Sequence, residues 1–588
     1  MTSQSSSSRL RIALVALALL LGLALLVIQL VRWQVVQRDE FGPATGLFGQ
    51  TLGGRSASAT AADGAAKSPD RGAIIDINGV PLAFDTYQWE IWIEPRLVPK
   101  GSEAALTAQL VELLGPTLRQ TPDELLRILQ ERAPGVVTLT RQGSQAAGET
   151  IAGWQRLDIS AKALPVRIYP QGTLAAHLLG FVNGEPRAYY GVEERYDSYL
   201  RAMSPPFHYA YPENQAFYQQ LPEGWREVLP SAGGQDLVLT IDRRLQSITE
   251  RVLGEAIGQY QAESGTIIVM NPRDGAILAM ASLPAYDPNQ YGATNTLVLA
   301  DPAISKQYEP GSVFKIVTMA AGIDAGVITP DTVLTDTLSI EVGDRLIYNS
   351  NMRTFGPVTI REALVLSLNI PTAQVALLLQ EARFYQYIQR FGFGQLTEVD
   401  LANEGPGSVK APGDSLWSRS DLATNAFGQG LAVTPMQMVR AAAVIANGGL
   451  LVRPHVVDSM VFRGRLVQPD TSPMRRVIQP EAADAVADMM VSVVEKGSPA
   501  AKVPGYKVAG KTGTAQVAIQ GGYHPTATIH SFVGFVPADD PAFVALVKLD
   551  VPKAYPWADG TAAPTFARLA AELLPVLRVP PEQMANRP

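Results

Sequence analysis

One uncharged apolar segment near the amino terminus limits the architectures open to this chain. Residues 12–31 carry no charge, and Gln29 is their one clearly polar residue. A helix of about 20 such residues spans the roughly 30 Å hydrocarbon layer of a bilayer. The segment therefore predicts a transmembrane helix, with a cleaved signal peptide and a buried core helix as alternatives. Its length, and the lack of a small-residue cleavage site at residues 31–34, favour an uncleaved signal-anchor.

The surroundings of this segment predict where the rest of the chain lies. Arginines flank the segment on both sides, so the short leading tail, residues 1–11, favours a cytoplasmic amino terminus. No second apolar run of spanning length occurs after residue 40. We therefore expect a single-pass protein of the cell membrane whose catalytic part lies outside the cytoplasm.

The amino-acid composition limits the kinds of ligand and of catalytic group that this chain can use. The chain has 588 residues, a net charge of -7, five histidines and no cysteine. Its length predicts two or more folded domains. Its net negative charge argues against nucleic-acid binding. The absence of cysteine excludes disulfides, thiolate catalysis and cysteine-bound metals. The few histidines leave a Ser-His-Asp triad few candidates for its base, whereas a serine activated by lysine needs none.

Shifts in composition divide the chain into segments. A stretch rich in Gly, Ala, Ser and Thr follows the apolar helix, and alternating apolar residues around Asn78-Gly79 then predict the hairpin that opens an ordered α+β domain. This domain ends in an irregular segment, residues 207–227. The expected order is a cytoplasmic tail (1–11), the transmembrane helix (12–31), a flexible stalk (32–70), a first ordered α+β domain (71–233), a second domain (234–578) and a carboxy-terminal tail (579–588).

The second domain has strands at both of its ends and helices between them. Apolar runs predict strands at 236–241, 265–270, 276–282, 506–509, 511–518, 529–536 and 542–549. Helical spacing predicts helices at 243–261 and 565–577, and a helical middle from Ser312 to about Arg390. This arrangement indicates an α+β fold in which helices cover an antiparallel sheet.

Ser312 and Lys315 form an S-x-x-K pair at the start of the helical middle. On a helix the two side chains share one face, so the amine could take the hydroxyl proton. Glu309-Pro310-Gly311 marks a helix start, and Ser312 could equally be a helix N-cap. The two interpretations are compatible, because a backbone N–H at a helix start is free to bind an oxyanion. The motif alone is weak evidence, since such a pair is expected about once by chance.

Lys315 can act as a base only in its neutral form. Its apolar neighbours, among them Phe314 and Ile316, predict burial, which lowers the pKa of an amine. A second cation nearby would lower this pKa further, and Lys511 is the natural candidate. The alternative is a Lys315 on a solvated helix face, but its neighbours leave little polar surface there.

Two further polar motifs follow in the sequence. Ser367-Leu368-Asn369 interrupts an apolar segment, where it could form a turn, or could relay a proton to a leaving amine and hold Lys315. Lys511-Thr512-Gly513-Thr514 begins a strand pattern, with a hairpin turn as the alternative. In a strand, Gly513 would let a substrate backbone approach as an added edge strand, and its neighbours would hold a carboxylate.

The three motifs, in this order, resemble those of the penicillin-binding proteins, and among them the class B enzymes, which join a membrane anchor and a pedestal to a D,D-transpeptidase domain. The likeness extends beyond the motifs, to residues 71–72 with 78–79, 167–170 with 177–180, 191–193 with 196–197, and 427–431 with 434–435. The glycines that the family carries after Tyr196-Asp197 are replaced in this chain by residues 201–206.

The resemblance implies that residues 71–233 form an extended pedestal of the dimerisation type, and that residues 234–578 form a transpeptidase domain like those of penicillin-binding proteins and serine β-lactamases. Ser312 would attack the penultimate D-Ala carbonyl of a peptidoglycan stem peptide and expel the terminal D-Ala, and an amine of a neighbouring stem would take the acyl group. The implied roles are Lys315 as the base, Ser367 and Asn369 for proton transfer and positioning, Lys511, Thr512 and Thr514 for the substrate carboxylate, and the N–H groups of Ser312 and Thr514 as the oxyanion hole.

The resemblance also implies partners. β-Lactams would be trapped at Ser312, and neither a metal nor an organic cofactor is called for. No glycosyltransferase domain fits before residue 234, so glycan polymerisation would come from a polytopic glycosyltransferase during cell-wall synthesis in elongation, shape maintenance or division. The alternatives are a membrane-attached serine β-lactamase, against which the pedestal and anchor argue, and a β-lactam sensor, for which the tail before residue 12 is too short.

Overall fold

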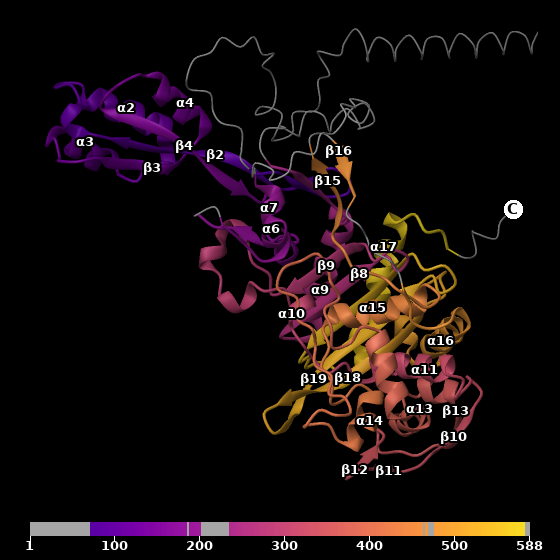
Figure 1. Cartoon of the computed structure of the whole chain (residues 1–588). Coiled ribbons are helices and arrows are strands. Elements are labelled where there is room, and N and C mark those ends of the chain that lie inside the picture. Colours follow the sequence, from indigo (N-terminus) through magenta and orange to yellow (C-terminus); the bar gives the residue numbers. More distant parts are fainter. Residues whose placement is uncertain (1–70, 185–186, 202–233, 463–464, 469–474, 582–588) are drawn as a thin grey trace, which may run out of the picture. The chain divides into compact units, whose positions relative to one another are not determined.

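A computed structural model describes residues 71–184, 187–201, 234–462, 465–468 and 475–581 (Figure 1). The predicted cytoplasmic tail, transmembrane helix, stalk and irregular segment 207–227 lie outside these residues, as does the carboxy-terminal tail from residue 582. Within the described ranges, no helix is long and apolar enough to cross a membrane.

The predicted hairpin around Asn78-Gly79 is present. Strand β1 (Ile74–Ile75) pairs antiparallel with β2 (Pro81–Ile93), and Gly79 takes the positive φ of 83° that the turn requires. The long β2 then pairs with β3 (Val137–Gly143) and β4 (Ile159–Ile168). Three helices enclose a core with these strands: α2 (Glu103–Leu114), α3 (Pro122–Gln130) and α4 (Gln145–Gly153). The first domain is therefore α+β, as predicted.

One sheet joins the predicted pedestal to the second domain. Its strand order is β16-β15-β7-β1-β2-β3. Strand β7 (Asp236–Leu239) pairs parallel with β1 and antiparallel with β15 (Val457–Phe462), which in turn pairs with β16 (Arg465–Val467). Short elements complete this part of the chain: α5 (Ala176–Leu179), β5 (Phe181–Val182), β6 (Ala188–Tyr189), α6 (Gly191–Arg195) and α7 (Asp197–Leu200).

A buried ion cluster lies beside this sheet, and we call it the junction cluster: Arg71, Asp85, Arg167, Glu193 and Asp197. The Glu193 carboxylate accepts hydrogen bonds from both guanidinium groups, 2.8 Å from Arg167 Nε and 2.8 Å from Arg71 Nε. Arg167 also donates to Asp85 at 2.9 Å, and Arg71 to Asp197 at 2.6 Å. Burial raises the pKa of Glu193, but the two arginines outweigh burial and leave this pKa below its usual value.

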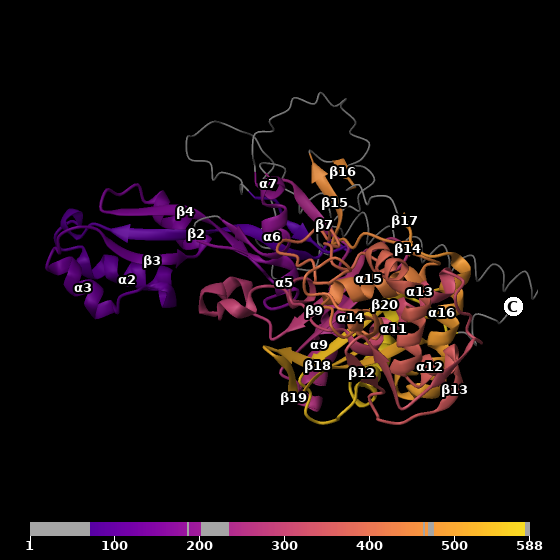
Figure 2. The same cartoon turned by 60° about the horizontal axis from the view of Figure 1, so that its bottom comes forward.

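The second domain is built on a five-stranded antiparallel sheet with the order β18-β19-β20-β8-β9. The strands are β8 (Ser264–Met270), β9 (Ile277–Leu283), β18 (Ala509–Ile519), β19 (Gly522–Val536) and β20 (Phe543–Asp550). Alternate residues of β8 enter different cores: Ile267 and Val269 pack with α9 (Arg243–Tyr260) and α17 (Ala562–Val576), while Ile268 and Met270 join the helical middle. Helices thus cover both faces of the sheet (Figures 1 and 2), and the predicted layering is confirmed.

The helical middle differs from its prediction. Helix α11 (Lys315–Asp324) is followed by four short strands before helices resume. These strands are β10 (Val333–Asp336), β11 (Ser339–Val342), β12 (Arg345–Tyr348) and β13 (Gly356–Thr359). They form two hairpin-like pairs, β11 with β12 and β10 with β13, and Gly343, at a φ of 65°, makes the β11–β12 turn. The prediction of a continuous helical block is therefore wrong between residues 333 and 359, because strands of four residues are too short to show a clear period.

Helices resume after β13. Further elements, of which α10 precedes α11 in the chain, complete the domain. They are α10 (Pro302–Ser305), α12 (Ile360–Val365), α13 (Asn369–Arg390), α14 (Arg419–Ala426), α15 (Pro435–Ala446), β14 (Leu450–Leu451), β17 (Arg475–Arg476) and α16 (Pro480–Ser492). The predicted separate strand at 506–509 is wrong. Tyr506 closes a turn on Val503 and donates its hydroxyl to the Val579 carbonyl at 2.7 Å, and β18 begins only at Ala509.

Candidate active site

Ser312 lies in a tight turn that leads into helix α11. Residues 311–314 form a 3-10 turn, and the α-helix begins at Lys315. Pro310 occupies the cap position, so the alternative in which Ser312 is the N-cap is wrong. The Ser312 side chain is half-buried, and its hydroxyl makes no hydrogen bond with the described residues. This hydroxyl is therefore available to a ligand.

Three glycines allow this turn to sit tightly against its neighbours. A Cβ on Gly513 would lie 2.8 Å from Ser531 Oγ and 3.0 Å from the Pro310 carbonyl oxygen. A Cβ on Gly428 would lie 2.2 Å from the Gly311 carbonyl oxygen, and the Gly311 N–H donates to the Gly428 carbonyl at 3.0 Å. The space that Gly513 leaves is therefore filled by the serine turn. Strand β18 is an outer strand of the five-stranded sheet, so its free edge is where the predicted substrate strand could pair.

Lys315 is buried, as predicted. None of its surface is exposed, and its Nζ donates to the Ser367 carbonyl at 2.6 Å and to Asn369 Oδ1 at 2.9 Å. Burial lowers the pKa of Lys315 well below its usual value, and the charge of Lys511 lowers this pKa further. No carboxylate lies among its contacts in the described residues to restore the charge. The prediction that Lys511 lowers the pKa of Lys315 is thus confirmed.

These contacts leave one position of the Lys315 amine free. A neutral amine has two N–H donors and one lone pair, and the Ser367 carbonyl and Asn369 Oδ1 occupy both donors. The lone pair can then accept a proton from a hydroxyl. Ser367 Oγ lies 3.4 Å from Lys315 Nζ, whereas the structure has no hydrogen bond between Lys315 and Ser312. Lys315 is therefore nearer to proton exchange with Ser367 than with Ser312.

Ser367 links the two lysines. Its hydroxyl accepts a hydrogen bond from Lys511 Nζ at 3.0 Å, so its own proton points away from that ammonium group, and Lys315 Nζ stands on another side. The backbone of Ser367 has a positive φ of 57°, which a non-glycine residue rarely adopts. This conformation presents its carbonyl and its hydroxyl to the same amine. The S-x-N motif thus links the two lysines and is more than a turn.

Lys511 combines burial with the retention of charge. Burial lowers its pKa to about 8, and Asp559 opposes this shift. Its ammonium group has three N–H donors, of which Ser367 Oγ and the Thr512 carbonyl, each at 3.0 Å, take two. One N–H is left to bind an anion. On the same strand the half-buried Thr512 precedes Thr514, whose hydroxyl accepts a hydrogen bond from the Ala558 N–H at 3.1 Å.

Two supporting residues were missed from the sequence. The backbone N–H of Asn369 donates to Asn349 Oδ1 at 2.8 Å, and Asn349 Nδ2 donates to Asp336 Oδ1 at 2.8 Å. Both Asn349 and Asp336 are buried, and they hold the start of α13 where it carries Asn369. The sequence predicts helix for this part of the chain, and a lone polar residue in a predicted helix gives no reason to select Asn349 or Asp336. Recognising the short strands β10 to β12 would have placed both residues at strand ends near Asn369.

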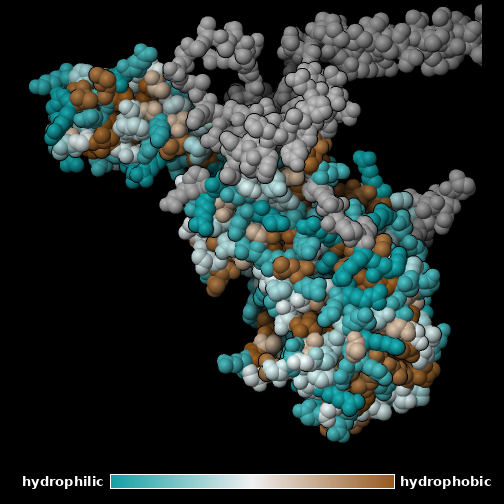
Figure 3. All heavy atoms as spheres, viewed as in Figure 1, coloured by the Kyte–Doolittle hydropathy of each residue, from teal (hydrophilic) through white to brown (hydrophobic). Residues whose placement is uncertain are grey.

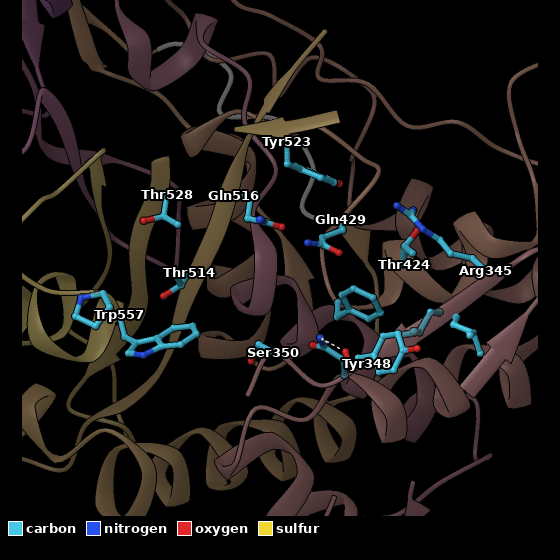
Figure 4. A pocket seen from close by; sticks show the side chains of 15 residues that line it. Arg345, Tyr348, Ser350, Thr424, Gln429, Thr514, Gln516, Tyr523, Thr528 and Trp557 are labelled. Carbon is cyan, nitrogen blue, oxygen red and sulfur yellow. Dashed lines mark hydrogen bonds between the residues drawn. The ribbon is translucent and has the colours of Figure 1, made fainter. Parts of the chain in front are cut away.

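A pocket of about 530 Å³ opens beside these residues, and we call it the site pocket. Asn369 and Thr514 belong to its wall, together with Arg345, Tyr348, Gln429, Gln516, Tyr523, Thr528 and Trp557 (Figure 4). Across the described ranges, no group of three or more histidine, aspartate or glutamate side chains could hold a metal ion. The site pocket thus borders the second motif at Asn369 and the third motif at Thr514.

The comparisons with known proteins agree with this site. The "Penicillin binding protein transpeptidase domain" matches residues 265–571, and the "Penicillin-binding Protein dimerisation domain" matches residues 66–205. The chain is 30% identical over 529 residues to stage V sporulation protein D of Bacillus subtilis, which covers 88% of this chain and 79% of that protein. It is 28% identical over 526 residues to the peptidoglycan D,D-transpeptidase FtsI of Escherichia coli, covering 88% of this chain and 86% of that one.

A solved structure is also similar. The crystal structure of penicillin binding protein 3 from Mycobacterium tuberculosis, complexed with ampicillin, matches with a TM-score of 0.67 and 26% identity. The match covers 89% of this chain and 98% of that one. The similarity thus extends over both domains.

Proposed function

Because this chain belongs to the class B penicillin-binding proteins, and is a serine-type peptidoglycan D,D-transpeptidase, we propose that it cross-links stem peptides through an acyl-enzyme on Ser312. The observation that carries this proposal is the buried Lys315, which bonds Ser367 and Asn369, faces Lys511 and has no carboxylate partner among the described residues. Burial and the charge of Lys511 lower the pKa of this amine and favour its neutral form, which can serve as a base.

Acylation follows from these contacts. The Ser312 hydroxyl gives its proton to the lone pair of Lys315 as Ser312 Oγ bonds to the carbonyl carbon of the penultimate D-Ala. The charge that develops on the carbonyl oxygen is stabilised by the backbone N–H groups of Ser312 and Thr514. Lys511 and Thr512 hold the terminal carboxylate. Ser367 then passes a proton to the departing D-Ala nitrogen, which the short path between Lys315 and Ser367 supports.

Deacylation reverses this path with a different amine. An amine of a neighbouring stem peptide attacks the ester carbonyl, gives up a proton through Ser367 to Lys315, and receives the acyl group as an amide. Ser312 leaves with a proton and is restored. A β-lactam would form the same ester, but its leaving nitrogen stays tethered, so the adduct persists. We therefore expect β-lactams to inhibit this site by covalent attachment to Ser312.

The proposal places this chemistry outside the cytoplasm. The apolar segment 12–31 would anchor the chain as a single-pass membrane protein, with peptidoglycan as the substrate on the far side. Glycan strands would come from a polytopic glycosyltransferase in elongation or division. The relatives named for sporulation and for peptidoglycan transpeptidation support a role in building the cell wall.

Labelling with a fluorescent penicillin tests the proposal. The full chain in detergent should form a covalent adduct that persists for minutes and maps to Ser312, and Ser312→Ala should form none. Lys502→Ala, an exposed lysine away from the site, is the matched control and should label normally. Rapid hydrolysis of the drug would instead indicate a β-lactamase, and labelling retained in Ser312→Ala would contradict the site.

A further inference from the structure

One cation in the site pocket, Arg345, forms no hydrogen bond or ion pair through its side chain with the described part of the chain. Arg345 begins strand β12, is exposed, and lines the site pocket that Asn369 and Thr514 also line. A guanidinium group offers five N–H donors in a planar fork that matches a carboxylate. An unpaired arginine on the wall of a substrate pocket is therefore a candidate for binding an anion.

The proposed function, on which this inference rests, sets the direction in which a donor peptide runs. Its terminal carboxylate lies at Lys511 and Thr512, and its reacting carbonyl lies at Thr514. A peptide that pairs antiparallel with the free edge of β18 then carries its earlier residues past Gln516, toward the turn between β18 and β19. At about 3.4 Å per residue, the second and third residues before the reacting bond lie about 7–10 Å further along.

The pocket wall at that end is polar and fixed. Tyr523, on β19, donates its hydroxyl to the Glu309 carboxylate at 3.0 Å, and the Gly430 N–H donates to the same carboxylate at 3.1 Å. Gln429 and Gln516 stand between Thr514 and Arg345 in the view of Figure 4. The two amide side chains are neutral, so the charge that this part of the pocket offers a ligand comes from Arg345.

Glu309 does not neutralise Arg345. The two groups are too far apart for an ion pair, and the donors on Glu309 are Tyr523 and Gly430. Arg345 is nevertheless near this wall: burial raises the pKa of Glu309, and the charge of Arg345 is among the influences that oppose this shift. The guanidinium group therefore lies by the part of the site pocket that the earlier residues of a donor peptide enter.

We propose that Arg345 binds a second carboxylate of the donor stem peptide, carried by a residue that precedes the two reacting D-alanines. Arg345 then determines specificity, because it favours donors whose upstream carboxylates are free over donors in which they are amidated. A carboxylate and a guanidinium group form two parallel hydrogen bonds, whereas a carboxamide brings no charge and can accept only through its oxygen. Lys511 and Arg345 would thus hold the donor at two anionic points on either side of the scissile bond.

The test uses two synthetic donor pentapeptides that both end in D-Ala-D-Ala. They differ only in whether their upstream carboxylates are free or amidated. The release of the terminal D-Ala gives kcat/KM for each peptide with the full chain in detergent. The wild type should prefer the free acid, and Arg345→Gln should lose about fivefold of that preference, the size of one exposed ion pair. Arg345→Glu should reverse the preference.

The matched control is Arg353→Gln, which removes the same charge from the segment between β12 and β13, outside the site pocket. This variant should keep the wild-type preference. A wild type that treats both peptides alike, or an Arg345→Gln variant that keeps the full preference, would overturn the inference. Labelling by fluorescent penicillin is measured in parallel: its absence from the wild type would refute the proposed function itself, while normal labelling with no peptide preference refutes only the role of Arg345.

Discussion

Two buried groups of charges in this molecule have opposite composition. In the junction cluster, each buried guanidinium group faces carboxylates: Arg167 meets Glu193 and Asp85, and Arg71 meets Glu193 and Asp197. In the active site, Lys315 and Lys511 are equally buried, and their direct partners are neutral oxygens of Ser367, Asn369 and Thr512. The first group balances its charge and the second does not.

Burial changes the pKa of a charged group differently in the junction cluster and in the active site. Where charge is balanced, burial leaves Glu193 ionised, as its lowered pKa indicates, and the cluster ties the segment before β1 to β4 and α6. Where charge is unbalanced, burial lowers the pKa of the lysines and favours the neutral amine that can act as a base. Lys548 is an intermediate case, because its neighbour Asp550 opposes the effect of its burial. Reactivity follows the missing carboxylate rather than burial alone.

The largest effect is expected from removing the unbalanced base. Lys315→Met should reduce the second-order rate constant of acylation by penicillin about 10³-fold, the usual contribution of a general base. The thermal stability of this variant should be equal to or above that of the wild type, because a buried amine without a counter-ion is replaced by an apolar chain. Stopped-flow labelling and a thermal melt measure the two quantities. A strong loss of stability would place Lys315 with the balanced cluster and contradict the comparison.

The junction cluster should respond in the opposite way. Glu193→Gln leaves Arg71 and Arg167 without their shared carboxylate, and we expect a loss of about 3–5 kcal/mol in the free energy of unfolding. Acylation per folded molecule should not change, since no residue of the cluster lines the site pocket. Denaturant unfolding and penicillin titration check this pair of outcomes. A variant that is fully stable but slow to acylate would refute the structural role.

The two groups should also make stability depend on pH in two separate ranges, one alkaline and one acid. Lys511 has a pKa of about 8 in the folded chain and about 10.5 when unfolded, so the unfolded state binds more protons between these values and stability rises as pH increases from 8 to 10.5. The full gain is about 3 kcal/mol. Glu193 has a lowered pKa, so its contribution is present above pH 4.5 and is lost as pH falls through its folded pKa.

Variants separate these two contributions. Lys511→Met should remove the rise above pH 8 and leave the acid limb, while Glu193→Gln should remove part of the acid limb and leave the alkaline rise. Unfolding curves between pH 3 and 10 provide the measurement. If Lys511→Met kept the alkaline rise, the assignment of that rise to Lys511 would fail.

The smallest effect concerns Asp559, a carboxylate whose charge acts on Lys511. Asp559 raises the pKa of Lys511 against its burial, so Asp559→Asn should lower that pKa. The alkaline fall in acylation should then begin at lower pH, with a loss of about two- to threefold at pH 8. Asp540→Asn, a surface carboxylate paired with Arg273, is the control and should leave the profile unchanged. An unchanged profile in Asp559→Asn would show that Lys511 does not limit the rate there.

The sequence predicted the elements that local pattern determines. The antiparallel sheet, its covering helices and the hairpin at Asn78-Gly79 follow from hydrophobic period and turn chemistry, and they are present. The burial of Lys315 and the effect of Lys511 on it were also predicted, because the apolar neighbours of Lys315 are visible in the sequence and Lys511 is part of a motif.

Tertiary contacts determined what the sequence did not predict. Ser312 lies in a 3-10 turn because that turn must fit against Gly428 and Gly513, which are distant in the sequence. The strands between residues 333 and 359 are short and were read as helix, and this concealed Asn349, which holds Asn369. The junction cluster was missed as well, since its arginines and carboxylates come from segments whose pairing only the folded chain shows.

The pH dependence of acylation tests the central claim most directly, because it reports the charge of Lys315 in the working enzyme. With the full chain in detergent, the second-order rate constant for penicillin should reach its plateau well below the usual pKa of a lysine, because the pKa of Lys315 is strongly lowered, and should fall above the pKa of Lys511, about 8. A rate constant that climbs tenfold per pH unit from pH 6 to 10 would show an ordinary, protonated lysine and would contradict the account.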